Sequence, residues 1–353
     1  MTLHISAERL RGFIASAYRK VGISESDANR IAELQTEADL RGADGHGVFR
    51  LPQYIRRIKT GGVNVAPNIR IERQTAAMAL VDGDNGMGHL VMHFAAQTAI
   101  AKARQSGVAW VGARMSNHAG PASLYATMPL AEGMIGLYFA VGNANHLAPW
   151  GGIELLLSTN PIAVAVPARE EMPIVLDMAT TTAAYGKVKT AAQRGEQMPA
   201  GWMIDFEGKP LTDPKRSDEG MLLPLGGMEA GFKGYGLSLV IGLLAGTLNQ
   251  AAMGREVIDF NKDDHSVTNT GHAIVAIDPA AFGDAEQFRT RVDRLVRDIR
   301  ASRRLPGVER IWLPGEQSQT KRIERMKEGI PVPQPLMDSL NKVAAELCIE
   351  QLG

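Results

Sequence analysis

Helical periodicity gives way to short apolar runs near residue 65, and this change most constrains how the chain can fold. In the first sixty residues, apolar positions such as Leu10, Phe13, Ile14 and Ala17 recur three and four residues apart, which predicts helices. Ser6 can cap the first of these helices, and Ser24 or Ser26 the second. Pro52 suits the first turn of a third helix, which Gly61-Gly62 ends.

After residue 65, short apolar strands alternate with helical segments. The expected strands are a hairpin at 69–82 and single strands at 108–111, 135–141, 162–166, 174–176 and 273–277. The expected helices are 89–104, 122–132, 182–193, 235–252 and 285–302, followed by two short amphipathic helices around IPVPQP. We therefore expect an α/β body over residues 66–319, with residues 1–65 forming a helical part that packs with the 320–353 segment.

A Rossmann dinucleotide site is disfavoured. Gly83, Gly86 and Gly88 in DGDNGMGH do not have the GxGxxG spacing. No acidic residue follows at the end of a second strand of a βαβ unit, where the ribose would be bound.

The overall charge makes nucleic acid an unlikely class of partner. Thirty-eight basic residues balance thirty-eight acidic ones, so no counterion release drives binding. The single cysteine, Cys348, rules out an intrachain disulfide and fits a reducing compartment. The N-terminal sequence lacks the apolar core of a signal peptide, and the apolar stretch Gly236–Leu248 is too short to span a bilayer. We therefore expect a cytoplasmic protein in which this stretch forms a buried helix.

The densest group of polar residues is DGHGVFR at 44–50, followed by Tyr54. Two glycines around His46 suggest a mobile turn that a ligand can approach. Arg50 and Tyr54 are four residues apart, so a guanidinium and a phenol share one helix face and can hold a carboxylate. The alternative, a structural arginine and a surface histidine, has about even weight.

A second group, Ser116-Asn117-His118-Ala119-Gly120, follows an expected strand and precedes a helix. Catalytic groups are common in such loops, and an imidazole can move protons near neutral pH. Reduction of a 2-oxo acid by hydride creates an alkoxide, which needs a proton. A loop histidine bonded to a backbone carbonyl is the alternative, and function is slightly favoured.

Two further segments are typical of cofactor sites, although neither is specific alone. Asp177 ends an apolar strand and can contact a ribose hydroxyl, while Thr180 to Thr182 lead into a helix whose N-terminus can bind a pyrophosphate. A plain threonine cap explains the second segment equally well. Lys233 offers a charge at the start of the apolar helix, and the turn at Gly315-Glu316 can close over a cofactor.

No metal site is expected. His89 and His93 are four residues apart but lack the glutamate of HExxH and a third ligand. His265, beside two aspartates, is typical of a solvated loop.

Taken together, the motifs resemble the type 2 malate/L-lactate dehydrogenase family, which includes sulfolactate, ureidoglycolate, diketogulonate and piperideine-2-carboxylate oxidoreductases. They occur in the family's order, from about Ser6 to about Glu328: DGHGVFRLPQY, SNHAGPAS, APWGG, STNPIAVAVP, DMATTTAAYGKV, GFKGYGL and LPGE.

This resemblance implies a non-Rossmann fold with a mixed-sheet cofactor domain, a helical region made by both chain ends, and a homodimer. It implies proton transfer by His118 or His46 and binding of the substrate carboxylate by Arg50 and Tyr54. It also implies cofactor contacts, for NAD or NADP, at Asn143, Asp177, Met178, Ala179, Thr180, Phe232, Lys233, Gly315 and Glu316.

Two departures from the family pattern affect the substrate more than the reaction. Ala119 stands where many members have phenylalanine, and Gly45 where many have serine.

Three functions remain open. The first is hydride transfer between NAD(P)H and a small 2-oxo or 2-hydroxy acid. The second is reduction of a cyclic imine carboxylate such as piperideine-2-carboxylate, whose ring the small residues would admit. The third, a cofactor-binding protein without catalysis, is disfavoured because both histidines and Arg50 are present.

Overall fold

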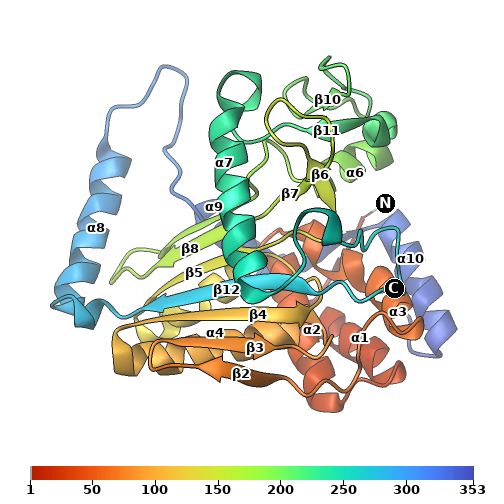
Figure 1. Ribbon diagram of the computed structural model, residues 1–353, viewed down its shortest axis with the longest axis horizontal. Coiled ribbons are helices and arrows are strands. Elements are labelled where there is room, and N and C mark those ends of the chain that lie inside the picture. Colours follow the sequence, from red (N-terminus) through yellow and green to blue (C-terminus); the bar gives the residue numbers. More distant parts are fainter. Residues whose placement is uncertain (1) are drawn as a thin grey trace.

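A seven-stranded mixed sheet forms the centre of the computed structural model, which describes residues 2–353 (Figure 1). In spatial order its strands are β2 (Arg70–Gln74), β3 (Met78–Asp82), β4 (Val108–Ser116), β12 (Thr270–Ile277), β5 (Ile135–Ala140), β8 (Ile162–Val166) and β9 (Ile174–Met178). The β3–β4 pair is parallel and the other pairs are antiparallel. Strand β12 enters the sheet between β4 and β5, so a late segment of the chain completes its centre.

The predicted hairpin and single strands are confirmed, but several strands are longer than expected. Strand β4 runs to Ser116 and β12 begins at Thr270. These extensions carry polar side chains that break the apolar pattern, yet their backbones still pair with neighbouring strands. The extension places the loop that follows β4 directly at the sheet's end.

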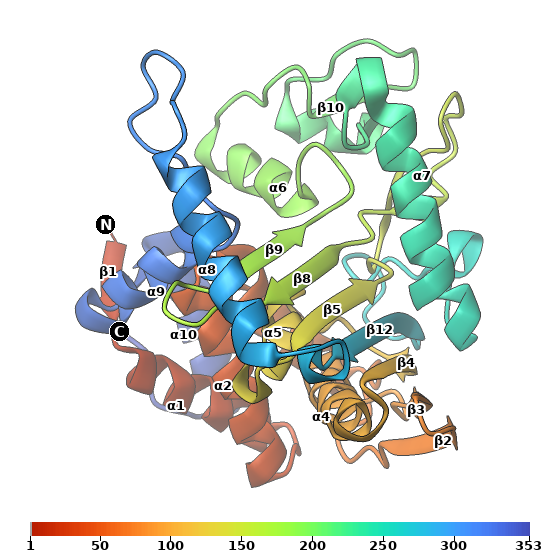
Figure 2. The same cartoon turned by 90° about the vertical axis from the view of Figure 1, so that its left-hand side faces the viewer.

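Alternate residues of β12 face two different layers of helix (Figure 2). Ile274 and Ala276 pack with helix α4 (Gly88–Ser106) in one core, whereas Ala273 and Val275 pack with α7 (Gly227–Ala245) in another. The sheet is therefore buried on both faces around its centre.

Helix α7 differs from the expected buried helix in its start and in its exposure. It begins at Gly227 rather than near residue 235, with non-helical backbone angles at Ala230. Glycines let one face lie close to its neighbours, since a Cβ on Gly242 would stand 2.3 Å from the Met253 side chain. Large apolar side chains on the other face are about half exposed, including Phe232 and Val240.

The segment Gly227–Asn249 is, among residues 2–353, the one helical stretch long and apolar enough to cross a membrane by length and composition alone. This corrects the expectation that the apolar stretch is too short. Its buried face belongs to the core of the sheet, as in the core helix of a globular protein.

The two ends of the chain pack around one apolar core and lie on the same side of the molecule (Figures 1 and 2). Its helices are α1 (Ala7–Lys20), α2 (Glu25–Leu40), α3 (Leu51–Lys59) and α10 (Gln334–Leu347). Ser6 and Ser24 cap α1 and α2 as expected, and Pro52 lies in the first turn of α3. Strand β1 (Thr2–Ile5) pairs with β13 (Ile330–Pro333), a pairing too short to be evident in the sequence.

Further turns, helices and short strand pairs connect these parts of the chain. They are 3₁₀ turns η1 (Asp44–His46) and η2 (Val48–Arg50), helices α5 (Ser123–Ala126), α6 (Tyr185–Arg194), α8 (Ala285–Ala301) and α9 (Glu316–Glu328), and the short strand pairs β6 (Asn145–Leu147) with β7 (Leu157–Ser158) and β10 (Met203–Asp205) with β11 (Gly220–Leu222).

Candidate active site

Four residues predicted from the sequence line one cavity of about 120 Å³: His46, Arg50, His118 and Asn143. His46 and Arg50 end two consecutive 3₁₀ turns before α3, His118 follows β4, and Asn143 follows β5. The cavity therefore forms where the central strands end against the helical layer.

Close packing holds the His46 turn in place. A Cβ on Gly47 would lie 2.1 Å from the Asp39 carboxylate, which accepts a 2.8 Å hydrogen bond from the Val48 N–H. Asp44 pairs with Arg325 of α9. The expectation of an uncrowded turn is thus wrong at Gly47, which permits a close approach, while a Cβ on Gly45 would meet nothing within 4 Å.

The Arg50 guanidinium is buried and bonded to uncharged acceptors. It donates to Gly45 O at 2.9 Å, to Gln53 Oε1 at 2.8 Å and to Asn261 Oδ1 at 3.3 Å. Burial lowers the pKa of Arg50 from its ordinary value. A positive charge held by neutral partners in a cavity is well suited to bind an anion.

The His118 ring is held through its Nδ1 atom. The Tyr54 hydroxyl lies 2.5 Å from Nδ1, and the Gly120 N–H donates to the same nitrogen at 3.4 Å. The Phe260 and His46 rings are stacked with the His118 ring, with centroids 5.0 Å and 5.6 Å away. Tyr54 thus lies behind His118 and holds it, where the sequence suggested a direct contact with substrate.

Burial and the charge of Arg50 control the protonation of this cluster. Burial, followed by Arg50 and neighbouring histidines, holds the pKa of His118 well below its usual value. Burial, followed by the charge of Arg50, lowers the pKa of His46 to about 4. Burial raises the pKa of Tyr54, so its hydroxyl keeps its proton. At neutral pH, the free protein therefore has neutral imidazoles beside one cation.

A second set of buried residues fixes the His118 loop. His272 Nε2 lies 3.1 Å from Ser116 Oγ, and the Tyr125 hydroxyl donates to Ala119 O at 2.6 Å. The sequence analysis did not single out His272, although a histidine inside the apolar strand GHAIVAI was an available signal.

Several residues that sequence reasoning missed lie on the Arg50 side of the cavity. His146 and Tyr185 line it with their rings stacked at 3.7 Å, and burial lowers the pKa of His146 to about 4. Asn261 also lines it and accepts a 2.8 Å hydrogen bond from Lys189 Nζ. These residues belong to three distant segments, so no local motif links them.

The threonine segment does not form the expected helix N-terminus. Helix α6 begins at Tyr185, and its N-cap residue is Ala184. Thr180 is buried, and its hydroxyl donates to the backbone oxygens of Thr159 and Asn160. The hydroxyls of this segment bond to the backbone and do not cap α6.

Asp177 lies near the end of β9, just before this segment. Its carboxylate accepts a 2.8 Å hydrogen bond from the Ser123 N–H and remains open to solvent. The surrounding protein raises its pKa from the ordinary value, while the bond from Ser123 lowers it. Met178 and Ala179, which follow Asp177, are half-buried.

The other predicted cofactor residues lie outside the small cavity. Phe232 and Lys233 are exposed within α7, rather than before its start as the sequence suggested. Gly315 has a φ of +91° and packs against Val175 of β9. Glu316 is buried and bonded to Arg300, so its carboxylate stabilises the turn.

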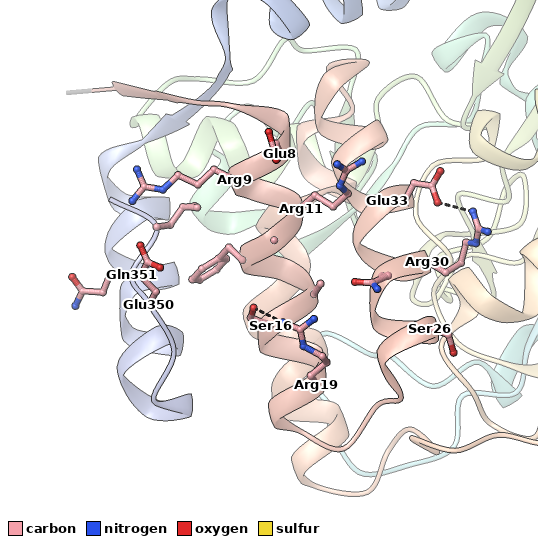
Figure 3. Close-up of a pocket in the computed structure, with 15 residues that line it drawn as sticks. Glu8, Arg9, Arg11, Ser16, Arg19, Ser26, Arg30, Glu33, Glu350 and Gln351 are labelled. Atoms are coloured by element: carbon pink, nitrogen blue, oxygen red, sulfur yellow. Dashed lines mark hydrogen bonds and ion pairs between the residues drawn. The ribbon is translucent and has the colours of Figure 1, made fainter.

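A separate hollow of about 780 Å³ lies between α1, α2 and the C-terminal residues (Figure 3). Arginine and glutamate side chains line it, and among them Arg30 pairs with Glu33 on the exposed surface of α2. It contains none of the residues predicted for catalysis. Within residues 2–353, no group of three or more His, Cys, Asp or Glu side chains is arranged to hold a metal ion.

Comparison with known proteins gives matches over almost the whole chain. Residues 5–341 match the family described as malate/L-lactate dehydrogenase. A malate dehydrogenase of Pyrococcus horikoshii is 39% identical over 99% of this chain and 97% of its own. A ureidoglycolate dehydrogenase (NAD(+)) of Escherichia coli O157:H7 is 34% identical over 94% of this chain and 93% of its own.

Solved structures give the same result. The P. horikoshii malate dehydrogenase structure superposes with a TM-score of 0.91 over 99% of this chain and 97% of that chain, at 36% identity. A delta1-piperideine-2-carboxylate reductase from Pseudomonas syringae pvar. tomato gives 0.85 over 97% and 100%, at 30% identity.

Proposed function

This chain belongs to the malate/L-lactate dehydrogenase family, and we propose that it transfers a hydride between a nicotinamide dinucleotide and a small 2-oxo or 2-hydroxy acid. The observation that carries this proposal is the convergence of His118 and Arg50 on one cavity. At about 120 Å³, the cavity is smaller than the roughly 300–1,000 Å³ typical of drug-sized ligands, which favours a small substrate.

Arg50 binds the carboxylate that all these substrates share. Its neutral partners leave the charge of the guanidinium available, and they hold the group in one orientation. Burial strengthens the attraction because little water screens it. The carboxylate thus places the adjacent carbonyl or hydroxyl group beside the imidazoles.

His118 moves the proton at the substrate oxygen. Tyr54 occupies Nδ1, which leaves Nε2 as the nitrogen that can face a ligand. The Tyr54 hydroxyl can donate to a neutral Nδ1 or accept from a protonated one, so it supports both states of the ring. Both histidines have lowered pKa values, but within residues 2–353 no hydrogen bond like that from Tyr54 holds the His46 ring, and this difference favours His118.

The chemistry of the cavity wall fits a nicotinamide ring. Small residues, among them Ala140, Gly142 and Ala144, form part of the wall and leave room for a flat group. When bound, the nicotinamide supplies or takes up the hydride. We propose that Asn143 contacts the nicotinamide ring and that the solvent-exposed carboxylate of Asp177 contacts a ribose hydroxyl.

NAD is the cofactor we propose, with NADP as the alternative. A relative of this chain has NAD(+) in its name. A carboxylate at the ribose also disfavours the extra phosphate of NADP by charge repulsion. Titration of each reduced cofactor by fluorescence, with Asp177→Asn beside the native protein, measures this preference.

The test of the reaction is spectrophotometric turnover of NADH and NADPH across a panel of 2-oxo acids. His118→Asn should lower kcat/KM by about 10²- to 10⁴-fold, as expected for loss of a general acid. His265→Asn, in an exposed loop, is the matched control and should keep native rates. Native rates in both His118→Asn and His46→Asn would refute the mechanism.

Reduction of a cyclic imine carboxylate is the second candidate. A piperideine-2-carboxylate reductase is among the structural neighbours, and the small side chain of Ala119 in the cavity wall leaves room for a ring. Including piperideine-2-carboxylate in the panel separates the two reactions. Cofactor binding without turnover of any member would instead indicate a non-catalytic protein.

We further propose that the protein is a cytoplasmic homodimer. The exposed apolar face of α7, with Phe232, Val240 and Leu243, is of the kind buried between subunits. Val240→Asp should reduce the mass measured by light scattering from that of a dimer to that of a monomer. Lys187→Asp, at an exposed position elsewhere, should leave the mass unchanged.

A further inference from the structure

We propose that Lys189 is a specificity-determining residue, which together with Arg50 selects substrates that carry a second negatively charged group besides the 2-oxo carboxylate. This inference rests on the proposed function and names the substrate class: 2-oxo acids with a second carboxylate or a sulfonate. The shared chemistry is a compact dianion.

Lys189 and Arg50 reach the same oxygen atom. Lys189 Nζ donates to Asn261 Oδ1 at 2.8 Å, and Arg50 Nη1 donates to that atom at 3.3 Å. The two cations come from α6 and from the turn before α3, and Asn261 comes from the loop before β12. Three distant segments therefore bring two positive charges to Asn261, which lines one edge of the cavity.

The orientation of Asn261 is fixed from behind. Its side-chain Nδ2 and its backbone N–H both donate to Asp259 Oδ1 at 2.9 Å. The amide oxygen must then point toward the two cations. Asp259 binds Asn261 and, within residues 2–353, forms no ion pair with Arg50 or Lys189.

The hydrogen-bond partners of both cations are uncharged throughout residues 2–353. One neutral amide oxygen between two positive groups leaves most of their mutual repulsion uncompensated. Burial, followed by Arg50, lowers the pKa of Lys189, while Asp259 and Asp218 raise it and Lys262 lowers it. An anion bound at this edge would relieve that repulsion.

The placement of Lys189 differs from that of a solubilising lysine. Lys187 lies on the same helix and is exposed, as lysines usually are, whereas Lys189 is half-buried. Its Nζ lies 5.6 Å from the centre of the Tyr185 ring, which stacks on His146 in the cavity wall. Its hydrogen bond to Asn261 places the ammonium group beside a residue that lines the cavity.

The charge of the substrate determines whether an anion pairs with Lys189. In a monoanionic 2-oxo acid, the carboxylate on Arg50 is the only compensating charge, and Lys189 keeps its neutral partner. A second acidic group one or two carbons away can reach the ammonium group at the same edge. An ammonium group acts as a compact point charge, so it accepts a carboxylate or a sulfonate alike.

The test compares Lys189→Gln with Lys187→Gln on four substrates. Oxaloacetate and sulfopyruvate carry the second charge, whereas pyruvate and 2-oxobutyrate do not. Lys189→Gln should reduce kcat/KM for both dianions by about tenfold or more, chiefly through KM, because a charge-assisted contact is lost. Rates on the two monoanions should change by less than about threefold, and Lys187→Gln should resemble the native protein on all four. Lys189→Arg, which keeps the charge, should recover part of the dianion preference.

Equal losses on all four substrates, no loss on any, or a native preference for monoanions would overturn the inference. A binding measurement separates its failure from that of the proposed reaction. The unreactive dianion malonate should raise the melting temperature of the native protein more than acetate does, and Lys189→Gln should abolish the difference. A native protein that turns over no 2-oxo acid but shows this malonate effect would refute the reaction and retain the anion site.

Discussion

The hydrogen bond between Tyr54 and His118 gives the most direct test of the proposed mechanism. Tyr54→Phe removes one oxygen, leaves the ring in its buried place, and strips Nδ1 of its 2.5 Å partner. A buried polar atom left without its partner costs about 1–3 kcal/mol. At about 1.4 kcal/mol per tenfold change, kcat/KM for reduction should fall about 5- to 150-fold.

The pH dependence of the rate adds a second, independent readout. Reduction needs the protonated imidazole, so its rate falls as pH rises through the pKa of His118. Tyr54 can accept a hydrogen bond from protonated Nδ1, which phenylalanine cannot do. The substitution should therefore lower the pKa of His118 further, and the fall in rate should move to lower pH.

Tyr18→Phe is the matched control. Tyr18 is also fully buried, and its hydroxyl donates to Gln35 Oε1 at 2.8 Å inside the helical core. Both variants should lose some thermal stability, but Tyr18→Phe should keep native kinetics. The reasoning fails if Tyr54→Phe keeps both the native kcat/KM and the native pH profile, or if both variants lose the same activity.

Two further predictions concern the stability of turns that position the site. Gly47→Ala would place a Cβ within 2.1 Å of the buried Asp39 carboxylate, so it should lower the free energy of unfolding by about 1–3 kcal/mol in denaturant titration. Gly45→Ala has open space around its Cβ and should change the free energy of unfolding little. Equal effects of the two substitutions would refute this account of the turn. Burial raises the pKa of Glu316, but hydrogen bonds from the Leu313 N–H and from Arg300 outweigh burial, so the net pKa lies below the ordinary value of 4.5. The charged Glu316 therefore stabilises the fold at neutral pH, and this stabilisation is lost as pH falls below 4.5. Glu316→Gln should accordingly lower the melting temperature at pH 7, with a difference from the native protein that narrows toward pH 4 and is contradicted by one that grows.

Periodicity predicted the central sheet because most of its strands are short apolar runs. Apolar runs such as Ile162–Val166 and Ile174–Leu176 were therefore visible as strands, and β8 and β9 confirm them. The failures occurred where tertiary contacts decide. Helix α7 extends back to Gly227 through a glycine-rich stretch of low helix propensity, and β1 forms only because β13 lies beside it. The domain division near residues 65 and 320 stays a prediction, which the shared core of the two chain ends supports.

The site was predictable to the extent that its residues form local motifs. His46 and Arg50 share one motif and His118 stands in another, and the cavity joins the two. Asn261 and Lys189 carry no such signature, since an asparagine in an acidic loop and a lysine on a polar helix are typical surface residues. Only the antiparallel insertion of β12 brings the Asn261 loop back to the site.

The charges of the cavity explain why its imidazoles and its cations occur together. With the site empty of anions, the field of Arg50 disfavours a second positive charge, and the pKa of His118 is held well below its usual value. A substrate carboxylate on Arg50 cancels that field at the place where His118 needs its proton, so binding itself favours the protonated ring. In the proposed mechanism the arginine thus has two effects, orienting the substrate acid and linking protonation of the general acid to the presence of substrate. A second cation at Lys189 makes the same linkage stronger for a dianion, because two positive charges are then neutralised in one binding step.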